Sequence, residues 1–203
     1  MSDSNTQFTA LCSRIKHCQI CQHALPFPPK PIFSAAQEAR IVLIGQAPGL
    51  KAHESATPWN DASGERLREW MGIDKTMFYN EKLLAILPMG FCFPGYKNGA
   101  DAPPRKECAP TWHKALLSFI RPTLTLLVGR YAQQYYMPQY KTLTQAVKEC
   151  CEVINEKNGS GTIVLPHPSG RNNRWLAQHP WFNERVLPQL KETIKKVINQ
   201  HPV

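Results

Sequence analysis

Long hydrophobic runs are absent from this sequence of 203 residues, in which no segment approaches the roughly 20 apolar residues that a membrane-spanning helix needs. Residues 1–10 are polar and lack the hydrophobic core of a secretory signal peptide. Internal repeats and low-complexity tracts are lacking as well. We therefore expect a cytoplasmic protein without a membrane partner. We also expect one domain over residues 1–203, with residues 1–38 packed onto it and nothing that requires more than a monomer.

Acidic residues are scarce relative to basic ones. The 15 Asp and Glu residues face 24 Lys and Arg residues, which gives a formal net charge of +9. Such an excess suits an anionic partner, because spaced cations make the contacts to phosphate groups. It is equally compatible with plain solubility, so composition does not choose between the two. The hydrophobic fraction of 42% is ordinary for a globular protein and argues against extensive disorder.

Cysteine, in contrast, is abundant, with an odd count of 7 residues. Disulfides are rare in the cytoplasm, so a metal or cluster is a better explanation for some of these thiols. The spacing of Cys18 and Cys21 lets two thiolates face one metal, although it also suits a redox pair. Cys92 and Cys108 flank a segment rich in proline and glycine and could supply two more ligands. The others are expected to be plain buried thiols in helices: Cys12, Cys150 and Cys151.

Four short apolar runs are predicted to be buried strands, at residues 40–44, 83–87, 124–128 and 162–165. Apolar residues at helical spacing predict helices around residues 8–15, 63–71, 108–119 and 186–197, and Ser63 is a candidate cap for the second of these. Residues 45–62 are expected to form a long loop. Strands that alternate with amphipathic helices predict an α/β fold with three layers, in which helices cover both faces of a four-stranded parallel sheet.

The first predicted strand runs into Gly45-Gln46-Ala47-Pro48-Gly49. Glycines let the backbone approach a ligand closely, and the N-terminus of a following helix favours an anion. A tight turn between strand and helix explains these five residues nearly as well. Ligands of parallel α/β sheets bind outside the carboxyl ends of the strands, and the unusual loops after the first, second and fourth strands lie at those ends. We therefore expect the binding site there.

The last predicted strand runs into a loop in which His167 lies between two prolines and is followed by Arg171, Asn172, Asn173 and Arg174. These residues are poor material for a core and good material for contacting phosphate groups. A loop that is simply solvated is the alternative, and the expected position beside the first loop makes it the weaker one.

A Gly-x-Ala-Pro-Gly loop after the first strand, paired with a His-Pro-Ser loop after the last, resembles the uracil-DNA glycosylase superfamily. The similarity extends from Cys18 to the last helix and is greatest to the bacterial and archaeal glycosylases that contain an iron–sulfur cluster. It implies a uracil-DNA glycosylase-like domain that flips uracil out of DNA and removes it by hydrolysis during base-excision repair.

The resemblance also implies a four-iron four-sulfur cluster, because Cys18, Cys21, Cys92 and Cys108 match the ligands of those enzymes. Zinc bound by the same four thiolates remains open. In either case the expected role is structural, joining the N-terminal segment to a loop near the DNA.

The resemblance also implies a catalytic carboxylate. Gln46 stands where one related group has glutamate. A second group uses an aspartate in a Gly-Asp-x-Ser-Gly stretch, which Asn60-Asp61-Ala62-Ser63-Gly64 resembles, so Asp61 is our candidate. A carboxylate beneath the sugar stabilises positive charge as the glycosidic bond breaks. The competing role for Asp61 is the N-cap of the following helix, and Glu54 is the fallback.

His167 corresponds to the residue that stabilises the departing uracil anion, and Trp59 to an aromatic residue that stacks on the flipped base, although a buried tryptophan is commonly just core. Pro88 replaces an asparagine that often reads the uracil edge, so hypoxanthine and other deaminated bases remain candidate substrates. The expected substrate contacts are Gly45, Gln46, Ala47, Pro48, Trp59, Asn60, Ser169, Arg171 and Asn172.

Two alternatives remain open. Gln46 favours a catalytically weak or inactive nucleic-acid-binding protein on the same fold, whereas Asp61 and His167 argue against it. A generic α/β enzyme with a phosphate ligand and a cysteine redox centre would require a reactive thiol of low pKa at Cys18 or Cys21.

Overall fold

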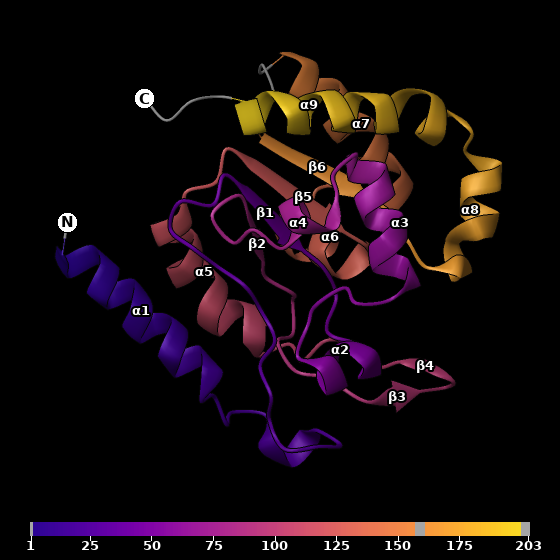
Figure 1. Cartoon of the computed structure of the whole chain (residues 1–203). Helices are drawn as coiled ribbons and strands as arrows, with labels where there is room; N and C mark the ends of the chain where they lie inside the picture. The colour runs from indigo at the N-terminus through magenta and orange to yellow at the C-terminus, as the bar shows by residue number, and fades with distance from the viewer. Residues whose placement is uncertain (1, 157–160, 200–203) are drawn as a thin grey trace.

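A four-stranded parallel sheet forms the centre of the computed structural model, which describes residues 2–156 and 161–199 (Figure 1). Its strands are β1 (Ile41–Ile44), β2 (Leu84–Ile86), β5 (Leu124–Val128) and β6 (Gly161–Leu165), in the order β2-β1-β5-β6. Every residue of β1 and β2 is buried. These strands are apolar without alternation because helices cover both of their faces. The four predicted strands and the α/β class are therefore confirmed.

The described helices are α1 (Ser2–Lys16), α2 (Leu50–Ser55), α3 (Ala62–Met71), α4 (Lys75–Phe78), α5 (Cys108–Ile120), α6 (Arg130–Tyr136), α7 (Leu143–Glu156), α8 (Asn173–Gln178) and α9 (Leu187–Asn199). Short 3-10 turns occupy Gln22–Ala24 and Gly170–Asn172, and a π-helical turn at Phe182–Val186 precedes α9. A small antiparallel hairpin consists of β3 (Tyr96–Lys97) and β4 (Ala100–Asp101). None of the described helices is long and apolar enough to cross a membrane.

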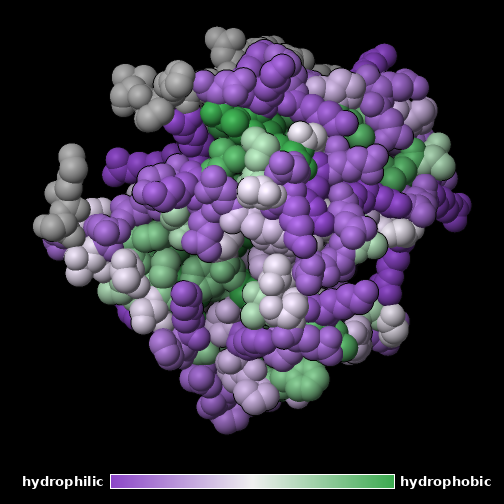
Figure 2. Space-filling view, viewed as in Figure 1, coloured by the Kyte–Doolittle hydropathy of each residue, from purple (hydrophilic) through white to green (hydrophobic). Residues whose placement is uncertain are grey.

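The direction of the crossovers assigns the helices to the two faces of the sheet. The connection from β1 to β2 runs one way along the sheet and carries α3, whereas the connection from β2 to β5 runs the other way and carries α5. Because parallel crossovers are right-handed, α3 and α5 lie over opposite faces. α9 packs against α3, and α1 packs against α5, where the rings of Phe8 and Phe119 meet edge to face at 5.7 Å (Figure 1). The face shown in Figure 2 is mostly hydrophilic, with hydrophobic residues visible in recesses between polar ones.

Three features differ from the sequence-based expectation. The expected loop at residues 45–62 contains α2, which has only six residues and therefore little periodicity to detect. The segment rich in proline and glycine contains the β3–β4 hairpin, and α6 and α7 fill the connection between β5 and β6. The helix expected at residue 63 begins at Ala62, and its N-cap is Asp61 and not Ser63, because the Asp61 carboxylate accepts a hydrogen bond from the backbone N–H of Gly64.

Candidate active site

A pocket of about 590 Å³ opens at the carboxyl ends of the parallel strands. Each of the four strands leads into it, because Gly45 follows β1, Pro88 follows β2, Gly129 follows β5 and His167 follows β6. The strand order reverses direction at β1, and the chains on either side of such a point diverge and leave a crevice. The pocket therefore lies at the edge of the sheet where the sequence predicted it.

Trp59 forms one wall of the pocket in a backbone conformation that a bulky residue rarely adopts, with φ of 57°. Its ring stacks on the ring of His167 with 5.4 Å between the centroids. A Cβ on Gly45 would lie 2.7 Å from this ring, and a Cβ on Gly64 would lie 1.9 Å from the Trp59 carbonyl oxygen. Both glycines are therefore required for Trp59 to pack where it does, and backbone strain of this kind is frequent at functional sites.

A hydrogen bond to its backbone fixes the position of His167, and the Trp59 ring stacks on its imidazole. The amide of Asn172 donates to the His167 carbonyl oxygen at 2.6 Å. Burial lowers the pKa of the His167 imidazole, and the negative charge of Asp61 raises it in partial compensation. The ring is therefore neutral near pH 7, a state in which one nitrogen donates a hydrogen bond and the other accepts.

Asp61 lines the pocket and also caps α3. One carboxylate oxygen accepts from the Gly64 N–H at 2.8 Å, which satisfies one of the free donors at the helix start. Because a carboxylate has two oxygens, the capping role leaves the other for the pocket. The two functions that the sequence suggested for Asp61 are thus compatible in one geometry.

The β3–β4 hairpin brings a second carboxylate, Asp101, to the same pocket, and sequence analysis missed it. Burial raises the pKa of Asp101, whereas Arg171 lowers it and Asp61 raises it. The missed signal is the Asn98-Gly99 pair. Both residues have positive φ, at 52° and 69°, and Asn-Gly is the strongest short-range indication of a hairpin.

The other predicted contacts lie in and around this pocket. The remaining predicted lining residues are Gln46, Ala47, Pro48, Ser169, Arg171 and Asn172. Asn60 is exposed, does not line the pocket and donates to the Ser55 hydroxyl at 3.4 Å. Glu54, the fallback carboxylate, is likewise exposed and outside the lining. Arg130 and Tyr131 line the pocket without having been predicted, and the guanidinium of Arg130 lies over the Tyr131 ring.

The four predicted cysteine ligands surround a second, smaller cavity with apolar walls: Cys18, Cys21, Cys92 and Cys108. Burial raises the pKa of the Cys92 thiol to about 12 and that of Cys108 to about 11, and it also raises the pKa of Cys21. A redox centre would need a lowered thiol pKa. Among the residues that the structure describes, no three His, Cys, Asp or Glu side chains form a group that could hold a metal ion.

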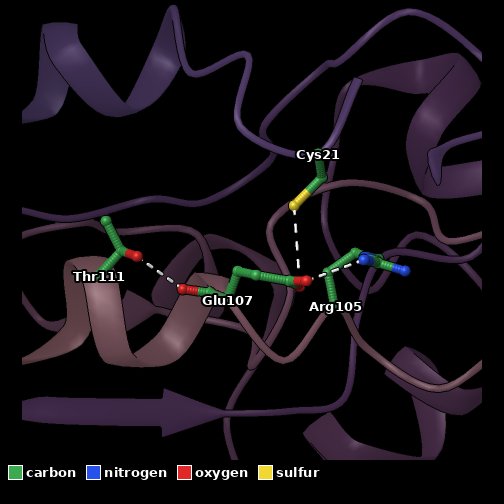
Figure 3. Close-up of polar contacts among 4 residues, drawn as sticks. All are labelled: Cys21, Arg105, Glu107 and Thr111. Atoms are coloured by element: carbon green, nitrogen blue, oxygen red, sulfur yellow. Dashed lines mark hydrogen bonds and ion pairs between the residues drawn. The ribbon is translucent and has the colours of Figure 1, made fainter. Parts of the chain in front are cut away.

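Figure 3 shows polar contacts of Cys21 and Arg105, two of the residues that line this cavity. The thiol of Cys21 donates to one carboxylate oxygen of Glu107 at 4.0 Å, and the other oxygen of Glu107 pairs with the Arg105 guanidinium at 2.9 Å. The Thr111 hydroxyl donates to the Glu107 backbone carbonyl one helical turn later. The start of α5 is thereby joined to the N-terminal cysteine segment.

Together, the fold and the pocket define an α/β protein with a pocket at the strand switch point of a parallel sheet, where ligands of such folds usually bind. A family model described as the uracil DNA glycosylase superfamily matches residues 31–191. The chain therefore belongs to this superfamily, as the two motif loops predicted. The matched region contains the whole sheet and the pocket, whereas Cys18 and Cys21 precede it.

Proposed function

We propose that this protein is a monofunctional DNA glycosylase that hydrolyses the bond between uracil and deoxyribose in DNA and leaves an abasic site. The observation that carries the proposal is the pairing, in a member of this superfamily, of a neutral histidine with carboxylates around one pocket. Breaking the bond places negative charge on the base and positive charge on the sugar. His167 and Asp61 supply the complementary groups.

The substrate has to leave the helical stack before this chemistry begins. The aromatic face of Trp59 offers a stacking surface for the flipped base, and its rare backbone conformation holds the ring in the pocket. A neutral His167 donates a hydrogen bond to a uracil carbonyl oxygen without adding a full charge. The donor gains strength as the base becomes an anion, so it stabilises the transition state more than the bound substrate.

Base selectivity in this protein cannot depend on the asparagine that reads the uracil edge in many related enzymes, because Pro88 occupies that position. Pro88 has no amide side chain, and its carbonyl oxygen accepts a hydrogen bond from the buried His113 at 3.1 Å. This position therefore cannot supply both a donor and an acceptor to the uracil edge. We accordingly extend the proposal to hypoxanthine and other deaminated bases as substrates.

The proposed partner is DNA, and the cationic rim of the pocket would contact its phosphates. Arg130 and Arg171 line the pocket, and the chain carries a formal net charge of +9. Neutralising phosphates releases bound counterions, so affinity is expected to fall steeply with salt concentration.

We include a four-iron four-sulfur cluster in the proposal. Four thiols from three separate segments surround one apolar cavity, which is a donor set that suits iron–sulfur ligation. A single zinc ion would require sulfur atoms about 3.8 Å apart, as follows from a Zn–S bond of about 2.3 Å in tetrahedral geometry. Zinc bound by the same four thiolates is the alternative, and iron and sulfide analysis of the purified protein distinguishes the two. Such a cluster would join the N-terminal segment to the start of α5 and has no step in the hydrolysis.

The test is alkali cleavage of labelled oligonucleotides that contain one uracil or one hypoxanthine, as single strands and as duplexes. Wild-type protein should generate alkali-labile sites, and Asp61→Asn should do so much more slowly, because asparagine keeps the cap but lacks the charge. Asp74→Asn is the matched control, since Asp74 caps α4 through the Met77 N–H at 2.7 Å and lies outside the pocket. Base release at the wild-type rate by Asp61→Asn would remove Asp61 from the mechanism. Tight DNA binding without any base release by the wild type would favour the inactive binding protein.

A further inference from the structure

We propose that Asp101 is the carboxylate that activates the attacking water. It would replace the glutamate that one related group has at the position of Gln46. The inference rests on the proposed glycosylase function. It assigns a catalytic role to the β3–β4 hairpin, which lies outside the two motif loops that follow β1 and β6.

The hairpin aims Asp101 at the first loop of the pocket. Tyr96 and Asp101 are paired directly across the two strands, so both side chains lie on the same face of the hairpin, and both line the pocket. One carboxylate oxygen of Asp101 lies 3.6 Å from the position that a Cβ on Gly49 would occupy. The carboxylate therefore reaches the Gly-x-Ala-Pro-Gly loop at its last residue.

Two side chains of the pocket hold the hairpin in this place. The Gln46 amide donates to the carbonyl oxygen of Ala102 at 3.3 Å, next to Asp101 in the chain. The Arg171 guanidinium donates to the carbonyl oxygen of Gly99 at 2.8 Å, at the tip of the hairpin. A glutamate at position 46 would present an ionised oxygen to the Ala102 carbonyl and would repel it, because a carboxylate has no hydrogen to donate. The residue that lacks the carboxylate is thus the residue that positions Asp101.

The two aspartates have surroundings that suit different tasks. Arg171 and Asp61 are the charged groups that act on Asp101, and Asp61 also acts on His167. Burial raises the pKa of Asp101, which makes its carboxylate a better proton acceptor, while the nearby Arg171 keeps the ionised form accessible. Asp61, fixed at the start of α3, supplies the negative charge that stabilises the sugar cation.

The resulting step is balanced. The bond between C1′ and the base nitrogen breaks, and its electron pair leaves with the base as an anion, to which His167 donates a hydrogen bond. The oxygen of water forms the new bond to C1′, and the proton of that water passes to the Asp101 carboxylate. This proton is then released to solvent, and the base anion is protonated by solvent, so that water and nucleotide give an abasic sugar and a free base.

The experiment measures single-turnover release of uracil against pH for wild type, Asp101→Asn and the control Asp74→Asn, together with DNA affinity from fluorescence anisotropy. Asp101→Asn is expected to slow release by at least about 100-fold, as for loss of a general base. DNA affinity should remain close to that of the wild type, the pH profile of the rate should lose the contribution from protonation of Asp101, and added formate should restore part of the activity. Circular dichroism shows whether Asp101→Asn folds. If it does not fold, Asp101→Glu is tested instead. Because Asp101→Glu keeps the carboxylate, it should retain more activity than a variant with an uncharged side chain at this position.

The outcomes separate the two proposals. If the wild type releases no base, the proposed function fails and this inference fails with it. If the wild type is active and Asp101→Asn retains its rate, or loses rate without a change in the pH profile, Asp101 is not the base and only the inference fails. Gln46→Glu provides an independent check. We expect it to lower activity by displacing the hairpin, and an increase would show that the missing carboxylate is not supplied by Asp101.

Discussion

Replacing Gly64 by alanine tests how closely α3 must approach the Trp59 loop. The added Cβ would lie 1.9 Å from the Trp59 carbonyl oxygen and 2.7 Å from its carbonyl carbon. Close carbon–oxygen contacts in proteins are about 3.3–3.6 Å, so the backbone of one segment has to move by more than about 1 Å. Such overpacking costs about 1–3 kcal/mol. The movement also strains the hydrogen bond from the Gly64 N–H to the Asp61 cap, and losing that cap costs about 1 kcal/mol. Alanine has a higher helix propensity than glycine by about 1 kcal/mol, so these two effects cancel.

The expected net loss of stability for Gly64→Ala is therefore about 1–3 kcal/mol. For a protein of this size, a loss of about 2 kcal/mol lowers Tm by about 4–8 °C. Urea and thermal unfolding measure the loss, and the rate of base release should fall as well because Trp59 moves. Gly170→Ala is the matched control for stability, since its Cβ would meet nothing nearer than 3.9 Å. A Gly64→Ala protein with the stability and activity of the wild type would refute the argument that Trp59 and α3 are in obligatory contact.

Three further predictions concern the buried histidine, the cysteines and the DNA-binding surface. His113 is buried, donates to the Pro88 carbonyl and accepts from the Tyr136 hydroxyl, and burial lowers its pKa to about 4 from 6.5. Because the unfolded chain binds the proton first, the stability that this residue contributes is present above pH 6.5 and falls as the pH drops towards 4, by up to about 3 kcal/mol. Urea unfolding of His113→Leu should lack this pH dependence, and an unchanged slope would show that other groups cause it. Cys92→Ser should lose bound iron, visible absorbance and thermal stability together, and a variant with full iron content would exclude Cys92 as a ligand. Arg130→Ala should reduce the slope of log affinity against log salt by about 1, as for one lost phosphate contact, and an unaltered slope would place Arg130 outside the DNA interface.

The fold was largely predictable from the sequence because its main signals are local. β1 and β2 are continuous apolar runs, β5 is apolar except for Thr125, and the longer helices carry apolar residues at helical spacing. The two motif loops directly follow strands β1 and β6, so the rule that ligands bind at the carboxyl ends of parallel strands was sufficient to bring Trp59 and His167 to one pocket. The family match over residues 31–191 agrees with that reading.

The sequence by itself determined the α/β class, the edge of the sheet that holds the pocket, and the superfamily, since these follow from patterns within single segments. Only the tertiary structure decided which carboxylates meet there. Asp101 enters the pocket because Gln46 and Arg171, which are distant from it in the chain, hold the hairpin by hydrogen bonds to its backbone. Nearly every residue has a backbone carbonyl that can accept a hydrogen bond. Such a bond therefore does not restrict which residue type accepts it, and the sequence does not reveal it. Contacts of this kind therefore become visible only when the chain is folded.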